Sequence, residues 1–392
     1  METPALLLDF AIILIAAVIG GTAFRYLKMP RVVGMLVAGI AIGPFTPGFV
    51  VKSEEIADLA LLGAVFLMFS SGLSFDIRTF RTLGSKPFLL AGLGVGLSFI
   101  LGFSLGTLIG WEPLHSLFLG LILTSTSTAL GLKLMVDMGL TEESGYELVM
   151  AAILIDDVVA LSLMTVVLGI AGPDTVSTPY LILGLAGILG LAALLVLVGT
   201  RTMPSILRFT DRLSPSSTVM VAVSFALLIS FGFGVLELSP FVGAFFAGSI
   251  IASTQQSSRV TSNMAPVTAI FMAVFFTSIG MLINPAELLK VALLGVALIA
   301  VAIISKIVPG LLVLRKERGT SAFGRMKLAT ILVPRAEISL IIAQYGVTVG
   351  APSGLLALAM FVVIATALFP GAMAWISRWP RVEKPKDQES FP

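Results

Sequence analysis

Long apolar stretches separated by short polar connections run through the whole chain. Most stretches are close to the ~20 residues that an α-helix needs to cross a bilayer. Charged residues and Pro or Gly positions mark the ends of each stretch. The predicted spans cover residues 5–24, 30–48, 54–73, 86–110, 114–136, 145–171, 178–200, 215–236, 239–254, 264–283, 287–314, 322–347 and 353–377. The pattern predicts an all-α polytopic membrane protein with about thirteen transmembrane helices.

The composition excludes an ordinary soluble enzyme. Of the 392 residues, 57% are hydrophobic and only 12% are charged, whereas about 25% of the residues in a soluble domain are charged. The lipid bilayer is therefore the expected surroundings. A scattered net charge of +2 gives no reason to expect a nucleic-acid partner. Because the chain has no cysteine and one histidine, disulfides, iron–sulfur sites and a His-based metal centre are excluded, and no cofactor is expected.

The basic residues predict how the chain is oriented in the membrane. Twenty of the 24 Lys and Arg residues fall in the connections or near the span ends on one side of the membrane, and only Lys52 and Lys290 fall on the other. Lys306 and Arg335 lie within spans. Since basic connections stay in the cytoplasm, the N-terminus is predicted outside and the C-terminus inside, in the cell inner (plasma) membrane.

Ionisable residues within the spans are the first candidates for function, because a charge at membrane depth is costly. Asp156 and Asp157 lie midway along the sixth span, and Lys306 lies deep in the eleventh. Neighbouring residues on a helix point about 100° apart, so the two carboxylates cannot share one partner equally. A single lysine compensates one of them, which leaves the other able to hold a proton or a cation. Lys306 is either a structural counter-ion or a participant in that exchange.

Two spans also contain signals that interrupt a helix. Five consecutive hydroxyl residues, Thr124 to Thr128, lie at mid-depth in the fifth span and can support an unwound stretch, although small residues there also suit helix packing. Pro334 lies in the middle of the twelfth span, beside Arg335 and Glu337, which either compensate the broken helix structurally or take part in function. If spans 1–6 and 8–13 are inverted repeats joined by span 7, the two interruptions correspond. Paired broken helices are the pattern of a transporter site at the membrane midplane.

The residues over the whole chain resemble the monovalent cation:proton antiporters of the CPA2 branch, the bacterial and archaeal Na⁺/H⁺ and K⁺/H⁺ exchangers. The resemblance rests on the Asp-Asp pair with an intramembrane lysine, which is its most specific feature, and on four longer segments. These segments are Pro30–Pro44, Phe66–Leu73, Phe275–Pro285 and Pro334–Ala343.

The resemblance implies a role for each candidate residue. Asp157 matches the carboxylate that binds the cation and the proton in turn, and Asp156 matches the neighbour that pairs with the lysine, here Lys306. Thr126 and Ser127 match the unwound stretch that offers oxygen atoms to the alkali cation, and Asp156 and Asp157 are its expected carboxylate ligands. Glu337 and Arg335 match charges that compensate the crossing of the broken helices.

The resemblance also implies a domain organisation and a homodimer. The dimerisation domain would comprise residues 1–85 and 215–286, the ion-transport core residues 86–177 and 287–378, the linker span residues 178–214, and the cytoplasmic tail residues 379–392.

The function expected is electrogenic exchange of Na⁺ or Li⁺ for protons by alternating access, and the protein is not expected to be an enzyme. K⁺/H⁺ exchange by the same fold stays open, because the sequence does not define the geometry of the cavity. A passive cation channel is the competing class, although it needs neither the paired aspartates with a lysine nor the repeated interruptions.

Overall fold

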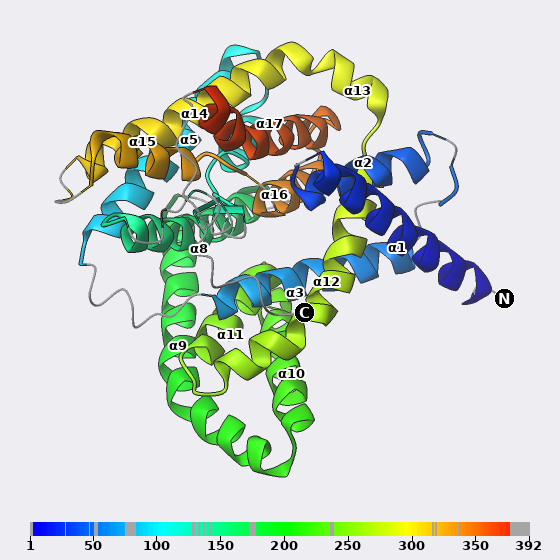
Figure 1. Cartoon of the computed structure of the whole chain (residues 1–392), viewed down its shortest axis with the longest axis vertical. Helices are drawn as coiled ribbons and strands as arrows, with labels where there is room; N and C mark the ends of the chain where they lie inside the picture. Colours follow the sequence, from blue (N-terminus) through cyan, green and yellow to red (C-terminus); the bar gives the residue numbers. More distant parts are fainter. Residues whose placement is uncertain are drawn as a thin grey trace, which may run out of the picture.

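A computed structural model describes residues 3–27, 29–46, 48–50, 54–74, 84–127, 130–131, 134–135, 138, 140, 143–171, 178–235, 239–315, 317, 320–335 and 337–376. Within these ranges the regular structure is helical, with no strand (Figure 1). The predicted tail, residues 379–392, lies outside the described residues. The helices are α1 (Thr3–Tyr26), α2 (Arg31–Ile42), α3 (Glu54–Leu73), α5 (Lys86–Leu108), α6 (Pro113–Leu121), α8 (Tyr146–Ala171), α9 (Thr178–Leu213), α10 (Pro215–Val235), α11 (Pro240–Ala252), α12 (Ser257–Met281), α13 (Pro285–Lys290), α14 (Ala292–Leu314), α15 (Ala322–Ile331), α16 (Glu337–Thr348) and α17 (Gly354–Ile376).

Each predicted span contains one helix or a pair of helices, so the all-α polytopic prediction is confirmed. Among the described residues, seven helices are long and apolar enough to cross a membrane by themselves, and four shorter apolar helices accompany them. The number of thirteen spans stays a prediction.

The main difference in boundaries is at α9, which continues beyond the predicted end at residue 200 to Leu213. Its 36 residues extend over roughly 54 Å at ~1.5 Å per residue, more than the ~30 Å of a bilayer core. The extra turns form because Met203, Leu207 and Thr210 recur at helical spacing and are buried. The basic residues that suggested a connection lie on the other faces of the same helix.

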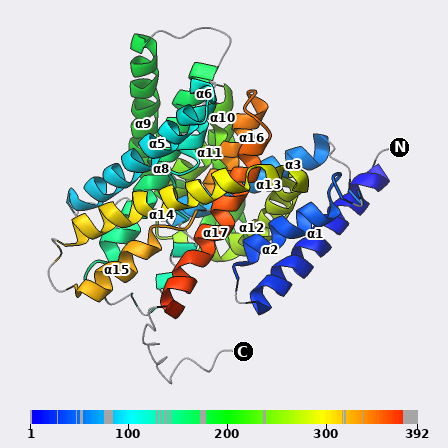
Figure 2. The ribbon, with the colours of Figure 1, turned by 90° about the horizontal axis from the view of Figure 1, so that it is seen from above.

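The helices form two groups, which Figures 1 and 2 show side by side. In one group α3 packs against α11 and α12, with α1, α2 and α10 around them. In the other group α5 packs against α6, α8 and α14, and α14 packs against α15 and α17. The long helix α9 contacts α10 and α11 of the first group and α8 of the second.

The packing partners recur between the two halves of the chain. α2 packs against α12 as α11 packs against α3, and α5 packs against α8 as α14 packs against α17. These pairs correspond when α1, α2, α3, α5, α6 and α8 are matched in order with α10, α11, α12, α14, α15–α16 and α17. The contacts therefore fit the two repeats that the sequence predicts.

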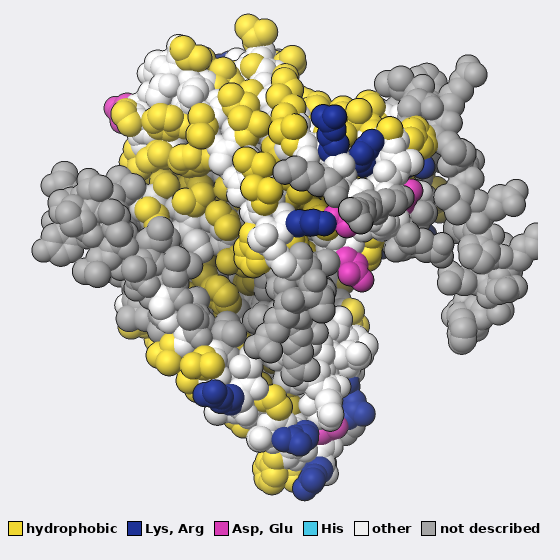
Figure 3. All heavy atoms as spheres, turned by 90° about the vertical axis from the view of Figure 1, so that its left-hand side faces the viewer, with side chains coloured by type: hydrophobic (Ala, Val, Ile, Leu, Met, Phe, Trp, Pro, Cys, Tyr) yellow, Lys and Arg dark blue, Asp and Glu magenta, His cyan; other side chains and the backbone are white. Residues whose placement is uncertain are grey.

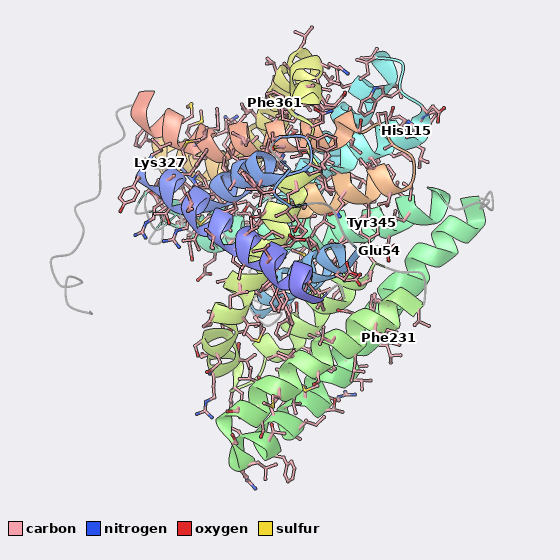
Figure 4. The ribbon with its side chains drawn as sticks, turned by 90° about the vertical axis from the view of Figure 1, so that its right-hand side faces the viewer. Glu54, His115, Phe231, Lys327, Tyr345 and Phe361 are labelled. Carbon is pink, nitrogen blue, oxygen red and sulfur yellow. The ribbon has the colours of Figure 1, made fainter. Side chains whose placement is uncertain are left out.

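The surface has the apolar character of a membrane protein. Large hydrophobic side chains such as Leu293 and Phe231 are 87% and 71% exposed, and Figure 4 places Phe231 on the outside of α10. Figure 3 shows hydrophobic side chains over much of one face, with Lys and Arg gathered toward its edge and lower end. In Figure 4, His115 at the start of α6 and Lys327 of α15 lie on opposite sides of the molecule. An apolar surface of this extent suits lipid.

Candidate functional site

The two predicted interruptions are present, and they meet. α6 ends at Leu121 and the chain has no regular secondary structure at Ser125–Ser127, whereas α15 ends at Ile331 and the chain has none at Val333–Arg335. Pro334 explains the second break, because it lacks an N–H group and disfavours a helical conformation at the residue before it. The hydroxyl run explains the first break, since its side chains can replace helical hydrogen bonds.

Each interrupted helix satisfies backbone groups of the other. The Ser127 N–H donates to the Pro334 carbonyl oxygen at 2.8 Å. The Ser339 hydroxyl, at the start of α16, donates to the Ile122 carbonyl oxygen at 2.7 Å. A buried backbone group without a partner is costly, so these bonds fix how the two broken helices cross.

Asp156 and Lys306 form a buried ion pair beside this crossing. Lys306 Nζ, from α14, donates to Asp156 Oδ2, from α8, at 2.5 Å, and each side chain is only 2% exposed. The Thr126 hydroxyl lies 2.9 Å from the same carboxylate oxygen and 3.1 Å from the Leu332 carbonyl oxygen. Because a hydroxyl has one hydrogen, Thr126 can turn toward Leu332 when Asp156 changes its partner. The other carboxylate oxygen, Oδ1, is buried without a hydrogen-bond partner among the described residues.

Asp157 is buried next to this pair, with only 1% of its surface exposed. It follows Asp156 on α8 and points about 100° further round the helix. Lys306 interacts electrostatically with both carboxylates. The structure therefore brings Asp156, Lys306 and Thr126 into direct contact, and Asp157 and Ser127 are buried directly after Asp156 and Thr126 in the chain. The binding of an ion by these five residues stays a prediction.

Arg335 is a second buried cation at the crossing. Its side chain is fully buried, and Nη1 donates to the carbonyl oxygens of Leu332 at 3.1 Å and Val333 at 2.9 Å. Its backbone N–H donates to the Thr366 hydroxyl of α17 at 3.0 Å. These bonds place the guanidinium at the carbonyl end of α15, where the helix dipole is negative. The side chain of Glu337 lies outside the described residues, so its predicted pairing with Arg335 stays a prediction.

Arg335 changes the charge balance that the sequence suggested. It interacts electrostatically with Asp156, so Asp156 has two buried cations near it, Arg335 and Lys306. Ser339 and Thr366, which bond to backbone atoms of the broken helices, were not among the residues predicted from the sequence. A single hydroxyl in a long apolar span is the only signal that either residue gives, and many such hydroxyls merely bond within their own helix.

The family model described as the transmembrane sodium/hydrogen exchanger matches residues 12–379. The chain belongs to this family. The Na(+)/H(+)-K(+) antiporter GerN of Bacillus cereus is 29% identical over 369 residues, which are 92% of this chain and 94% of GerN. The high-affinity Na(+)/H(+) antiporter NhaS3 of Synechocystis is 24% identical and aligns with 93% of this chain and 88% of its own. The K(+)/H(+) antiporter subunit KhtU of Bacillus subtilis is 25% identical, with 91% and 89% covered.

The fold of this family member is also that of a solved structure. The sodium proton antiporter MjNhaP1 of Methanocaldococcus jannaschii superposes with a TM-score of 0.76 over 97% of this chain and 98% of that one. The sequences are only 15% identical, so the likeness extends to the fold alone. The sequence-based assignment to the cation:proton antiporters is confirmed.

Proposed function

We propose that this protein exchanges an alkali cation for protons across the cell membrane. The observation that carries the proposal is the buried Asp156–Lys306 pair beside Asp157 at the crossing of two broken helices. Relatives that match nearly the whole chain are named as Na⁺/H⁺ or K⁺/H⁺ antiporters, which supports the same class of transport. Na⁺ or Li⁺ is the proposed substrate and K⁺ the alternative.

Asp157 is the proposed shared site for the cation and the proton. An alkali cation prefers hard oxygen ligands. Thr126 bonds to Asp156, the neighbour of Asp157 on α8, so the proposed cation ligands besides the Asp157 carboxylate are the hydroxyl and carbonyl oxygen atoms of Thr126 and Ser127. The cation also draws Asp156 away from Lys306. A lysine that loses its partner in a site shielded from water readily gives up its proton. The cation replaces one proton on Asp157, and Lys306 releases another. Two protons therefore leave for each cation that enters, so the exchange is electrogenic.

The two groups of helices are the proposed moving parts. Residues 1–85 and 215–286 form the dimerisation domain of a homodimer, residues 86–177 and 287–378 form the ion-transport core, and residues 178–214 link the two. The packing supports this division, because α3, α11 and α12 pack together while the broken helices pack with α5, α8, α14 and α17. The core changes between its outward-facing and inward-facing states when its buried charge is neutralised, because an uncompensated charge at membrane depth is costly.

The proposed orientation has the N-terminus outside and the C-terminus in the cytoplasm, as the distribution of basic residues predicts. Protease accessibility or a tag at each end, read in intact cells, tests this orientation.

The proposed function is tested in liposomes. The purified protein is reconstituted, a Na⁺ or K⁺ gradient is imposed, and the internal pH is recorded with and without a clamped membrane potential. Proton movement that depends on the cation and responds to the potential is the expected result. Cation flux without coupled proton movement would contradict the proposal and favour a passive channel.

A further inference from the structure

The side chain of Lys306 passes over a residue of α5 that has no side chain. Gly94 is buried, and a Cβ atom added there would lie 3.3 Å from Lys306 Cδ and 3.4 Å from Nζ. The separation from Cδ is tighter than ordinary van der Waals contact, so a methyl group would push the lysine side chain aside by a few tenths of an ångström. Gly92 and Gly96 lie on the same helix, and a Cβ atom at either has nothing within 4 Å. Of these three glycines, only Gly94 faces the lysine.

A second contact holds α5 and α14 in register beside Lys306. The hydroxyl of Ser98, one turn after Gly94, donates to the hydroxyl of Ser305 at 2.9 Å, and both residues are fully buried. Ser305 directly precedes Lys306 and donates in turn to the Ala302 carbonyl oxygen at 3.3 Å. Residues four apart share one face of a helix, so Gly94 and Ser98 present one surface to α14. The surface provides a slot over Gly94 and a hydrogen bond at Ser98.

We infer that Gly94 is a positioning residue for Lys306, because its missing side chain forms the slot through which the ammonium group reaches Asp156. The inference rests on the proposed function, in which a cation competes with Lys306 for Asp156. A side chain in the slot displaces the ammonium group and weakens the competitor of the cation. The Gly94→Ala protein is therefore expected to bind the transported cation more tightly.

The test compares Gly94→Ala with Gly92→Ala and Gly96→Ala, which place the same methyl group on the same helix in open space. In liposomes, we expect Gly94→Ala to lower KM for the cation by about threefold or more, with kcat changed by less than about twofold, as befits a coupling between contacting residues. The two control proteins are expected to match the wild type. A folded Gly94→Ala protein with an unchanged KM would overturn the inference.

The same substitution in a Lys306→Gln background separates positioning from helix packing. If Gly94 acts through the lysine, Gly94→Ala changes KM far less when Lys306 is absent. An equal change in both backgrounds would show that the glycine serves packing alone and would overturn the inference. If Gly94→Ala prevents folding, recovery of folding in the double variant supports the contact, and failure in both contradicts it.

The contact can also be measured without transport, from the melting temperatures of the wild type, the two single variants and the double variant. They form a double-mutant cycle for the contact between Gly94 and Lys306 that requires no exchange activity. A wild type that does not exchange cations and protons would refute the proposed function, whereas this cycle would still measure the contact.

Discussion

The backbone N–H of Ser127 donates a hydrogen bond to the carbonyl oxygen of Pro334. Each residue lies in the non-helical stretch of a different interrupted helix, so each interruption supplies a partner for the other. Because the bond joins backbone atoms, it requires neither a bound ion nor a particular charge state. The crossing can therefore keep its geometry while Asp156, Asp157 and Lys306 change their partners.

Asp157→Asn tests the residue proposed to bind both cation and proton. Asparagine has the same shape, but it cannot become negatively charged or carry the exchanged proton. Exchange in liposomes is expected to fall to the background of empty vesicles, while the melting temperature in detergent changes little. Asp58→Asn, at an exposed aspartate of α3, is the matched control and is expected to exchange normally. Normal exchange by Asp157→Asn would remove Asp157 from the site.

Lys306→Gln tests the source of the second proton. The glutamine keeps a polar side chain but carries no proton to release, so one proton and one monovalent cation would move in opposite directions. We expect exchange that no longer responds to the membrane potential, measured with an internal pH dye at clamped potentials. Should the variant still move net charge in each cycle, another group must carry the second proton.

The buried Asp156–Lys306 ion pair is also expected to stabilise the fold more than an exposed ion pair does. Removing one partner of a buried ion pair costs about 3–5 kcal/mol, because the other charge is left uncompensated. Lys306→Gln and Asp156→Asn should each lower the melting temperature clearly, and the double variant should recover most of the loss. Lys86→Gln breaks an ion pair of 2.7 Å whose lysine is 51% exposed, so it should cost less than about 1 kcal/mol. Equal losses from Lys86→Gln and Lys306→Gln would mean that burial does not govern the strength of the pair.

Local patterns predicted the parts of the site that act within one span. The run of apolar residues predicted the helices, Pro334 and the hydroxyl run predicted the breaks, and the rarity of charge at membrane depth selected Asp156, Asp157 and Lys306. Each of these signals reflects a free-energy cost that depends on one segment alone, so it can be recognised in the sequence without knowing the fold.

Partners from distant segments could not be predicted in the same way. Ser339 and Thr366 bond to backbone atoms of other segments, and Gly94 matters only because Lys306 lies over it. A hydroxyl or a glycine in an apolar span has several ordinary explanations, and only the packing of helices distinguishes them. Arg335 was recognised as a buried charge, but its bonds to the Leu332 and Val333 carbonyl oxygens depend on where α15 ends.

Thr126→Val tests whether the hydroxyl at the crossing contributes to cation binding. Valine has nearly the same shape but cannot bond to Asp156 or Leu332 or offer oxygen to a cation. The loss of about 1–2 kcal/mol expected for a buried hydrogen bond corresponds to a KM for the cation that rises roughly tenfold. Thr126→Ser restores the hydroxyl and should recover most of the affinity. Thr107→Val, at an exposed threonine that bonds only within α5, is the control. An unchanged KM in Thr126→Val would exclude the hydroxyl from the cation site.

Gly248→Ala tests the close packing of α3 on α11 in the group of helices proposed as the dimerisation domain. A Cβ atom at Gly248 would overlap the Phe69 carbonyl oxygen, and one at Gly72 of the facing helix would overlap the Phe245 carbonyl oxygen. Backbone atoms cannot move aside as a flexible side chain can, so the helices must separate. Overpacking of this kind costs about 1–3 kcal/mol or more, which should lower the melting temperature in detergent. Gly232→Ala on α10 adds the same methyl group where nothing lies within 4 Å, and its melting temperature should stay the same or rise slightly, because alanine favours a helix. If both substitutions had the same effect, the contact between α3 and α11 would not be as close as the structure shows.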